Sequence, residues 1–195
     1  MKARGSLSVA LAVLDQRVAV LTGEKRPDFV GFSRGGYGNP FDVLTVSGQP
    51  LADDFATSIG RALQQAGYRV TRVRVSNQAS PPEVQDALLG AQAERALMLL
   101  IHEWKSDTYN DTALHYQVTL RVLGAGGEEM ARAELAGDDD LGGSFMDPGG
   151  FAEEAVPKAY KRRLERLLND PAIVRALSPP PPPPAPPPTA PTTAT

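Results

Sequence analysis

The chain has 195 residues, no cysteine, a formal net charge of −3 and 18 prolines, ten of them between Pro179 and Pro191. The lack of cysteine excludes disulfides, thiol nucleophiles and CxxC metal sites. Twenty Lys and Arg against 23 Asp and Glu give no reason to expect a nucleic-acid partner. No apolar run approaches the roughly 18 residues of a transmembrane segment. We expect one domain over residues 1–177 and a disordered proline-rich tail over residues 178–195.

The first apolar run, residues 7–14, follows two basic residues, Lys2 and Arg4, and superficially resembles the start of a secretory signal. It is short, however, and the polar residues Asp15-Gln16-Arg17 follow it in place of a small-residue cleavage site. A continuous apolar run bounded by polar residues is typical of a central strand. We therefore predict a buried strand here.

Three helices are predicted along the chain. Residues 50–66 repeat apolar side chains at helical spacing and end before Gly67, a favourable residue after a helix C-terminus. A second helix begins at Ser80-Pro81-Pro82-Glu83, which has the S-x-x-E pattern of a capping box. The third covers residues 151–168, with acidic residues early and basic residues late, as the helix dipole favours. A short helical turn over residues 172–177 follows it.

Strands are predicted in the intervals, over residues 68–75, 96–105, 113–123 and 129–135, with residues 18–21 and 29–33 as further candidates. Strands joined through helices and then a run of hairpins indicate a mixed, mostly antiparallel sheet. The predicted fold class is thus a single α/β (α+β) domain whose helices lie mainly on one face of the sheet.

The two histidines define the first candidate site. If residues 96–105 and 113–123 form a hairpin around a loop at residues 106–111, the most compact register pairs Lys105 with Thr112 and places His102 opposite His115. Opposed side chains lie close enough for two imidazoles to share a metal ion or a proton. The alternative is a merely structural pair, because zinc sites need three or four ligands.

A glycine-rich segment forms the second candidate binding site, and we include with it the indole that neighbours the predicted histidine pair: Arg34, Gly35, Gly36, Tyr37, Gly38, Asn39 and Trp104. Glycines allow backbone N–H groups to approach an anion, and Arg34 supplies positive charge. Neither the P-loop nor the dinucleotide-binding pattern is complete, however. Two alternatives remain open: a structured loop that packs Tyr37 and Phe41 onto the domain, or a loop that offers exposed aromatic residues to a partner.

The remaining polar features indicate no chemistry. Residues 137–143 form an acidic glycine-rich loop that lacks the spacing of a calcium site, so we expect a solvated loop. The basic residues late in the third helix are expected to form a solvated face. No nucleophile, base and orienting residue can be assembled into a set, and we expect no enzyme activity and no cofactor.

Three segments carry a resemblance to a family: DFVGFSRGGYGNPFDV, PLADDFATSIGRALQQAGYRVTRV and ALMLLIHEWKSDTYNDTALHYQVTLRVLGAGGEEMARAEL. Together they resemble small bacterial envelope lipoproteins similar to YajG and to the auxiliary lipoproteins of envelope ABC transport systems. The resemblance covers residues 7–177 and rests mainly on the order of elements. It implies an α/β fold akin to the amino-terminal domain of TolB, and binding of envelope partners without catalysis.

The resemblance implies a location in the periplasm or at the outer membrane. Members of the family typically carry a signal peptide and a lipidated cysteine, whereas this chain has no cysteine and no convincing signal. It is therefore either a soluble relative, for which the cytoplasm remains open, or a chain whose export signal lies upstream of Met1. We expect an accessory protein that binds an envelope protein. The alternatives are an enzyme that uses His102, His115 and residues 35–38, and a scaffold that assembles through a sheet edge; the oligomeric state is not predicted.

Overall fold

A seven-stranded mixed sheet organises the chain. The structure is a computed structural model and describes residues 1–179. In chain order its elements are β1 (Ser8–Asp15), α1 (Val18–Leu21), β2 (Phe29–Arg34), β3 (Pro40–Leu44), α2 (Leu51–Gln65), β4 (Arg69–Arg72), α3 (Pro81–Gly90), β5 (Arg95–Thr108), β6 (Asp111–Gly124), β7 (Glu129–Gly143), α4 (Pro148–Leu168) and α5 (Pro171–Leu177). The predicted tail lies, from residue 180 onward, outside the described residues.

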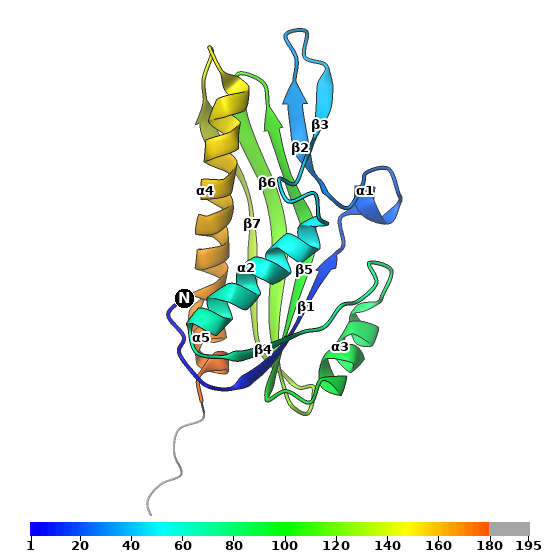
Figure 1. Cartoon of the computed structure of the whole chain (residues 1–195), viewed down its shortest axis with the longest axis vertical. Helices are drawn as coiled ribbons and strands as arrows, with labels where there is room; N and C mark the ends of the chain where they lie inside the picture. The colour runs from blue at the N-terminus through cyan, green and yellow to red at the C-terminus, as the bar shows by residue number, and fades with distance from the viewer. Residues whose placement is uncertain (180–195) are drawn as a thin grey trace, which may run out of the picture.

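Strand β5 is the central strand of the sheet and pairs with three other strands. Along one edge it pairs antiparallel with β6, which in turn pairs antiparallel with β7. Its other edge is shared: β1 pairs with it in parallel as far as Ile101, and β2 pairs with it in parallel from Ser106. Strand β4 extends the β1 arm and β3 extends the β2 arm. The sheet therefore forks beside the middle of β5 (Figure 1).

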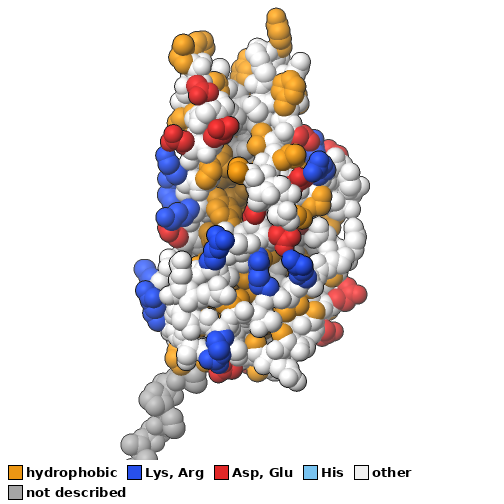
Figure 2. Space-filling view, in the orientation of Figure 1, with side chains coloured by type: hydrophobic (Ala, Val, Ile, Leu, Met, Phe, Trp, Pro, Cys, Tyr) orange, Lys and Arg blue, Asp and Glu red, His pale blue; other side chains and the backbone are white. Residues whose placement is uncertain are grey.

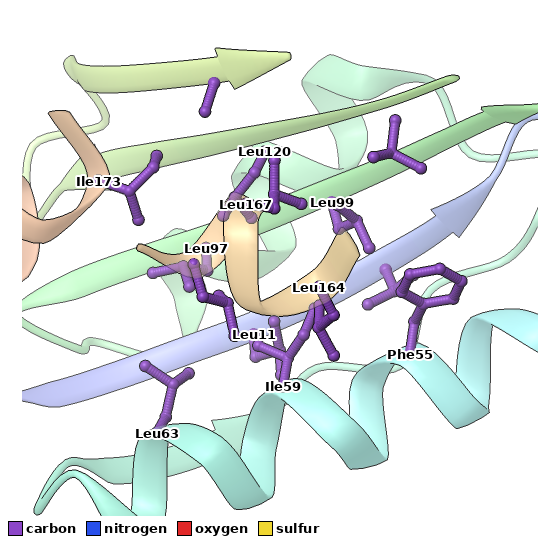
Figure 3. Packing of buried hydrophobic residues seen from close by; sticks show 14 of the residues in the cluster. Leu11, Phe55, Ile59, Leu63, Leu97, Leu99, Leu120, Leu164, Leu167 and Ile173 are labelled. Atoms are coloured by element: carbon purple, nitrogen blue, oxygen red, sulfur yellow. The ribbon is translucent and has the colours of Figure 1, made fainter. Parts of the chain in front are cut away.

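The main core lies between the sheet and three helices on one face, α2, α4 and α5, while α3 packs on the other face. Figure 3 shows the main core, where side chains from these helices meet those of β1, β5 and β6. In β1, alternate residues enter the two cores: Val9 and Leu11 face the main one, and Ala10 and Leu14 face α3. This burial on both faces explains why the strand is continuously apolar. The predicted fold class and the main placement of the helices are confirmed.

Local signals place most helix ends correctly. The capping box at α3 is formed as predicted, with the Ser80 backbone N–H donating to Glu83 Oε2 at 2.7 Å. Helix α4 begins three residues earlier than expected, at Pro148, because the Asp147 side chain accepts a hydrogen bond from the Gly150 backbone N–H at 2.9 Å. Pro157 lies inside this helix without ending it.

The register predicted for the β5–β6 hairpin is wrong. Lys105 pairs with His115, and Thr112 pairs with Thr108. The strands run past the expected loop at residues 106–111, and a register shift between Ile101 and Glu103 changes the pairing by one residue. Lys105 therefore takes the place opposite His115, three residues from its predicted pairing, and His102 lies in the bulge and does not face His115. The bulge changes the phase of the alternation, because Leu97, Leu99 and Ile101 face the main core before it and Trp104 faces the same core after it.

Three other predictions need correction. Residues 18–21 form the short helix α1 and not a strand. Strand β7 continues through the acidic segment predicted as a loop, because residues 138–140 pair with β6 as far as Ala113. Strand β3 was not predicted; four of its five residues are exposed, so it has no apolar alternation to detect.

Candidate functional site

Three loops come together at one end of the sheet: residues 35–39 between β2 and β3, residues 109–110 between β5 and β6, and residues 144–147 between β7 and α4 (Figure 1, top). Sheet pairing places them there, because Ser33 pairs with Thr108 and Asp111 pairs with Gly143. The Tyr109 hydroxyl also donates to the Gly36 carbonyl at 3.3 Å, which joins two of the loops directly.

Large apolar side chains project into solvent from these loops. Tyr37 is 98% exposed, Met146 is 88% exposed and Phe145 is 85% exposed. Five of the nine exposed large hydrophobic residues of the described chain lie at this end: Tyr37, Phe41, Tyr109, Phe145 and Met146. Figure 2 shows apolar side chains at both upper corners of the molecule, with apolar surface recessed between α4 and the β2–β3 hairpin. We call this set of five residues the apolar end.

The β2–β3 hairpin is held to the sheet by Arg34. Its Nε donates to Asp107 Oδ1 at 2.6 Å and its Nη2 donates to Asp107 Oδ2 at 2.5 Å. The hydrogen bonds and charge of Arg34 hold the pKa of Asp107 below its ordinary value. Gly38 turns the chain with φ of +80°, a conformation that glycine adopts readily. Arg34 therefore holds the hairpin in place against β5. Tyr37 and Phe41 are exposed on the hairpin, whereas one of the two predictions had them packed on the domain.

The β2–β3 hairpin is one of two projecting segments at this end, and we call it the β2–β3 prong. The other, which we call the β7–α4 prong, is the loop between β7 and α4. Gly142 has φ of +84° and begins the turn out of β7, and Asp147 caps the helix that follows. The Asp147 backbone N–H donates to Ser144 Oγ at 3.1 Å. Phe145 and Met146 thus occupy a short, hydrogen-bonded turn that directs them away from the core. Sequence reasoning missed this pair, because two apolar residues without strand or helix periodicity give no signal of their own.

A hollow of about 860 Å³ lies beside this prong, between the end of β7 and α4. Its apolar lining includes Leu141, Phe151 and Ala155, and its charged lining includes Glu153 and Glu154 together with Lys158 and Arg162 from the next turns of α4. The surrounding segment is strongly acidic: residues 138–154 contain six carboxylates and no Lys or Arg. This prong is therefore both apolar and negatively charged.

The histidines are not brought together. His102 Nε2 lies 3.3 Å from Thr119 Oγ1, whereas His115 Nδ1 lies 2.5 Å from Asp138 Oδ1. Over residues 1–179 the structure contains no group of three or more His, Asp or Glu side chains placed to hold a metal ion. The geometry on which the two-histidine hypothesis depended is thus absent.

Trp104 lies far from solvent, at 3% exposure. It packs edge-on against Phe55 and Tyr160 at ring-centroid distances of 5.1 and 5.6 Å, with Tyr116 at 6.0 Å. Burial raises the pKa of Tyr160 to about 12. The indole therefore belongs to an aromatic core beneath α2 and α4 and not to the surface site with which the sequence grouped it.

A smaller groove of about 350 Å³ lies between α2 and α4. Arg4, Arg61 and Lys161 line it together with Glu165, over an apolar floor that includes Leu164 and Leu168. This groove therefore presents basic side chains from the N-terminal segment, α2 and α4.

The sequence matches no protein-family model and no curated protein. Among solved structures, a Xanthomonas campestris protein assigned to the family DUF330 superimposes with a TM-score of 0.50 at 12% identity, covering 89% of this chain and 83% of that one. This likeness shows a shared fold. Lower scores are given by the PelC dodecamer of Paraburkholderia phytofirmans (TM-score 0.46, 13% identity, 85% and 86% coverage) and lipoprotein GNA1162 of Neisseria meningitidis (0.41, 14%, 80% and 96%).

None of the helices in residues 1–179 combines the length and the apolar character that crossing a membrane requires.

Proposed function

We propose that this chain is a non-enzymatic accessory protein of the bacterial cell envelope, and that it binds a protein partner through the apolar end. One observation carries the proposal: Tyr37, Phe145 and Met146, each at least 85% exposed, project from the same end of the sheet. Exposed apolar side chains that gather in one region are typical of interaction sites. Aromatic residues and Met are also the residue types enriched at protein interfaces.

The construction of the apolar end also supports a binding role. The hydrogen-bonded Arg34–Asp107 pair and the cap at Asp147 fix the two prongs on a rigid sheet and helix. Prongs that are already ordered lose little conformational entropy when a partner binds. The glycines of residues 35–38 leave the backbone accessible for adaptable contacts.

The envelope location is supported by the resemblance in sequence to the YajG-like and transport-associated lipoproteins. The shared fold is compatible with that resemblance and carries no information on location or partner. Location and partner are therefore tested together.

The test is photo-crosslinking in living bacterial cells. A benzoylphenylalanine residue replaces Tyr37 or Phe145, with position Val18 as the control because that residue is 73% exposed but lies on α1. We expect one protein adduct from positions 37 and 145, recovered in the envelope fraction, and none from position 18. If no adduct forms at either prong, or the same adduct forms at position 18, the proposal is wrong.

A second candidate, an assembly scaffold, is favoured by the free edge of β7. This strand has 15 residues, and within residues 1–179 its only strand neighbour is β6. Unpaired edges can add a strand from another molecule. Light scattering at high protein concentration separates the candidates, because a strict monomer excludes self-assembly through this edge.

A further inference from the structure

The charge around the apolar end restricts the chemistry of its partner. Building on the proposed function, we infer that the segment that docks at the apolar end carries basic side chains together with apolar ones. The apolar part enters between the prongs and the hollow beside α4, and the basic part meets the carboxylates of the β7–α4 prong.

The charges on the β2–β3 prong are already paired within the chain. Arg34 is paired with Asp107, and Lys25 Nζ donates to Asp42 Oδ1 at 2.7 Å. This hairpin therefore offers a partner its aromatic side chains, Tyr37 and Phe41, and little net charge.

The β7–α4 prong differs. Some of its carboxylates have partners: Asp139 is paired with Arg163, and Glu154 with Lys158. Four exposed carboxylates on or beside this prong form no ion pair in the described structure: Asp111, Asp140, Asp147 and Glu153. Asp147 directly follows Met146 in the chain, and Asp111 pairs with Gly143 at the end of β7. Figure 2 shows acidic side chains below the upper corner formed by the start of α4. These unpaired carboxylates therefore favour positive charge on a partner.

The hollow gives the partner a place for an apolar anchor. Leu141, Phe151 and Ala155 line it together with Glu153 and Glu154, whereas Lys158 and Arg162 line it from further along α4. An apolar side chain in a hollow with charged groups on its rim is the arrangement in which amphipathic helices bind grooves. The partner segment therefore needs both kinds of side chain close together, as on an amphipathic basic helix.

The same carboxylates disfavour an anionic lipid surface, because insertion of Phe145 and Met146 would bring negative charge against negative headgroups. A second copy of this chain is the other occupant to test, since Lys161 and Arg162 on α4 are basic. Both are outcomes of the experiment below.

The experiment measures binding of synthetic helical peptides to the full chain by fluorescence anisotropy. One peptide of about 18 residues carries Leu on one face and Lys on the other, the second replaces Lys with Glu, and the third replaces Leu with Ser. We expect the Leu–Lys peptide to bind at least about tenfold more tightly than either of the others, and to weaken as salt is raised. Equal binding of the Leu–Lys and Leu–Glu peptides overturns the inference.

Matched variants locate the binding. The triple change Asp111→Asn, Asp140→Asn and Glu153→Gln should weaken the Leu–Lys peptide at least about fivefold and reduce its salt dependence. The control triple change, Glu24→Gln, Asp86→Asn and Glu128→Gln, removes the same charge from exposed positions away from the apolar end and should leave binding unchanged. If both triple variants lose the same peptide affinity, the peptide is attracted nonspecifically to negative charge, and the inference is overturned.

The failure of this inference is distinguishable from that of the proposed function. Consider the outcome in which the prongs cross-link a partner in cells while peptide binding depends neither on the charge of the peptide nor on the acidic triple change. In that case the partner is not basic, and the proposed function stands. If light scattering shows a doubled mass that the acidic triple abolishes, the occupant is a second copy. If anionic vesicles bind the chain through Phe145 and Met146, the occupant is a lipid surface. The last two outcomes each overturn the inference.

Discussion

At the scale of single residues, Arg17 closes the fork in the sheet. All five N–H donors of its guanidinium are used: they reach both oxygens of Asp15 and the carbonyls of Pro27, Phe29 and Trp104. These acceptors come from β1, from β2 and the segment before it, and from β5. One side chain therefore joins the two arms of the sheet to the strand that they share.

Replacing Arg17 with Met should destabilise the fold by about 3–5 kcal/mol, because the fully buried Asp15 then loses its counter-charge. Urea denaturation measures the free energy of unfolding. The control is Arg132→Met, which removes a pair whose side chains are 53% and 61% exposed, and it should cost less than about 1 kcal/mol. Equal costs for the two variants would mean that the buried pair is not what holds the fork.

The Arg34–Asp107 pair gives a prediction in pH. The folded pKa of Asp107 is lowered, chiefly by hydrogen bonds from Arg34. Its stabilising contribution is therefore present above the unfolded pKa of about 4 and is lost as the pH falls through the lowered folded value. Replacing Arg34 with Met should raise the pKa of Asp107, as followed by carbon NMR of its carboxyl group. A titration that does not change on this substitution would contradict the assignment.

At the scale of elements, the β2–β3 arm depends on a close approach at Gly31. A Cβ there would lie 2.3 Å from the Ser106 carbonyl oxygen, on the strand with which β2 pairs. Gly31→Ala should therefore push β2 away from β5 and cost about 1–3 kcal/mol. Gly36→Ala, whose added Cβ would meet no atom within 4 Å, is the control and should be nearly neutral.

The same prediction has a functional readout. Because Gly31→Ala displaces the arm that carries Tyr37, it should also reduce cross-linking from position 37 while leaving position 145 unaffected. Loss at both positions would indicate general unfolding, which the denaturation measurement identifies independently.

The elements that the sequence predicts well are those whose burial is periodic. Strands β1, β5 and β6 and helices α2 and α3 have apolar patterns or caps that indicate their type directly. Strand β3 and the far end of β7 lack such patterns. In the far end of β7, Asp138 pairs with His115 and Asp139 pairs with Arg163. These partners are distant in the sequence, so no local pattern indicates that this acidic segment is a strand.

The candidate site was predictable only in part. The glycine-rich segment was identified with a partner-binding loop as one of its interpretations, and the structure leaves Tyr37 exposed at its tip. Phe145 and Met146 join it only because β7 is longer than the sequence indicates. The histidine pair was derived from a register that placed Lys105 opposite Thr112, whereas the strands continue past the predicted loop and Lys105 pairs with His115, so its error is also one of long-range pairing.

At the scale of the whole molecule, the apolar end lies apart from the region where the C-terminal helix α5 packs into the core. The chain passes from α4 into α5, whose Ile173 and Leu177 are fully buried, and the Tyr68 hydroxyl donates to the Leu177 carbonyl at 2.9 Å. Figure 1 shows α5 beneath α4, away from the β2–β3 hairpin. The stability that α5 contributes should therefore be separable from binding at the apolar end.

Truncation tests this separation and the domain boundary predicted at residue 177. A chain that ends after Asn169 loses α5, and with it the burial of Ile173 and Leu177, each worth about 1.5–3 kcal/mol. We expect a loss of about 3–6 kcal/mol, a large share of the 5–15 kcal/mol typical of a domain. A chain that ends after Pro179 keeps α5 and should melt at the temperature of the full chain and bind the Leu–Lys peptide equally. A lower melting temperature for this longer truncation would place the boundary of the domain beyond residue 177.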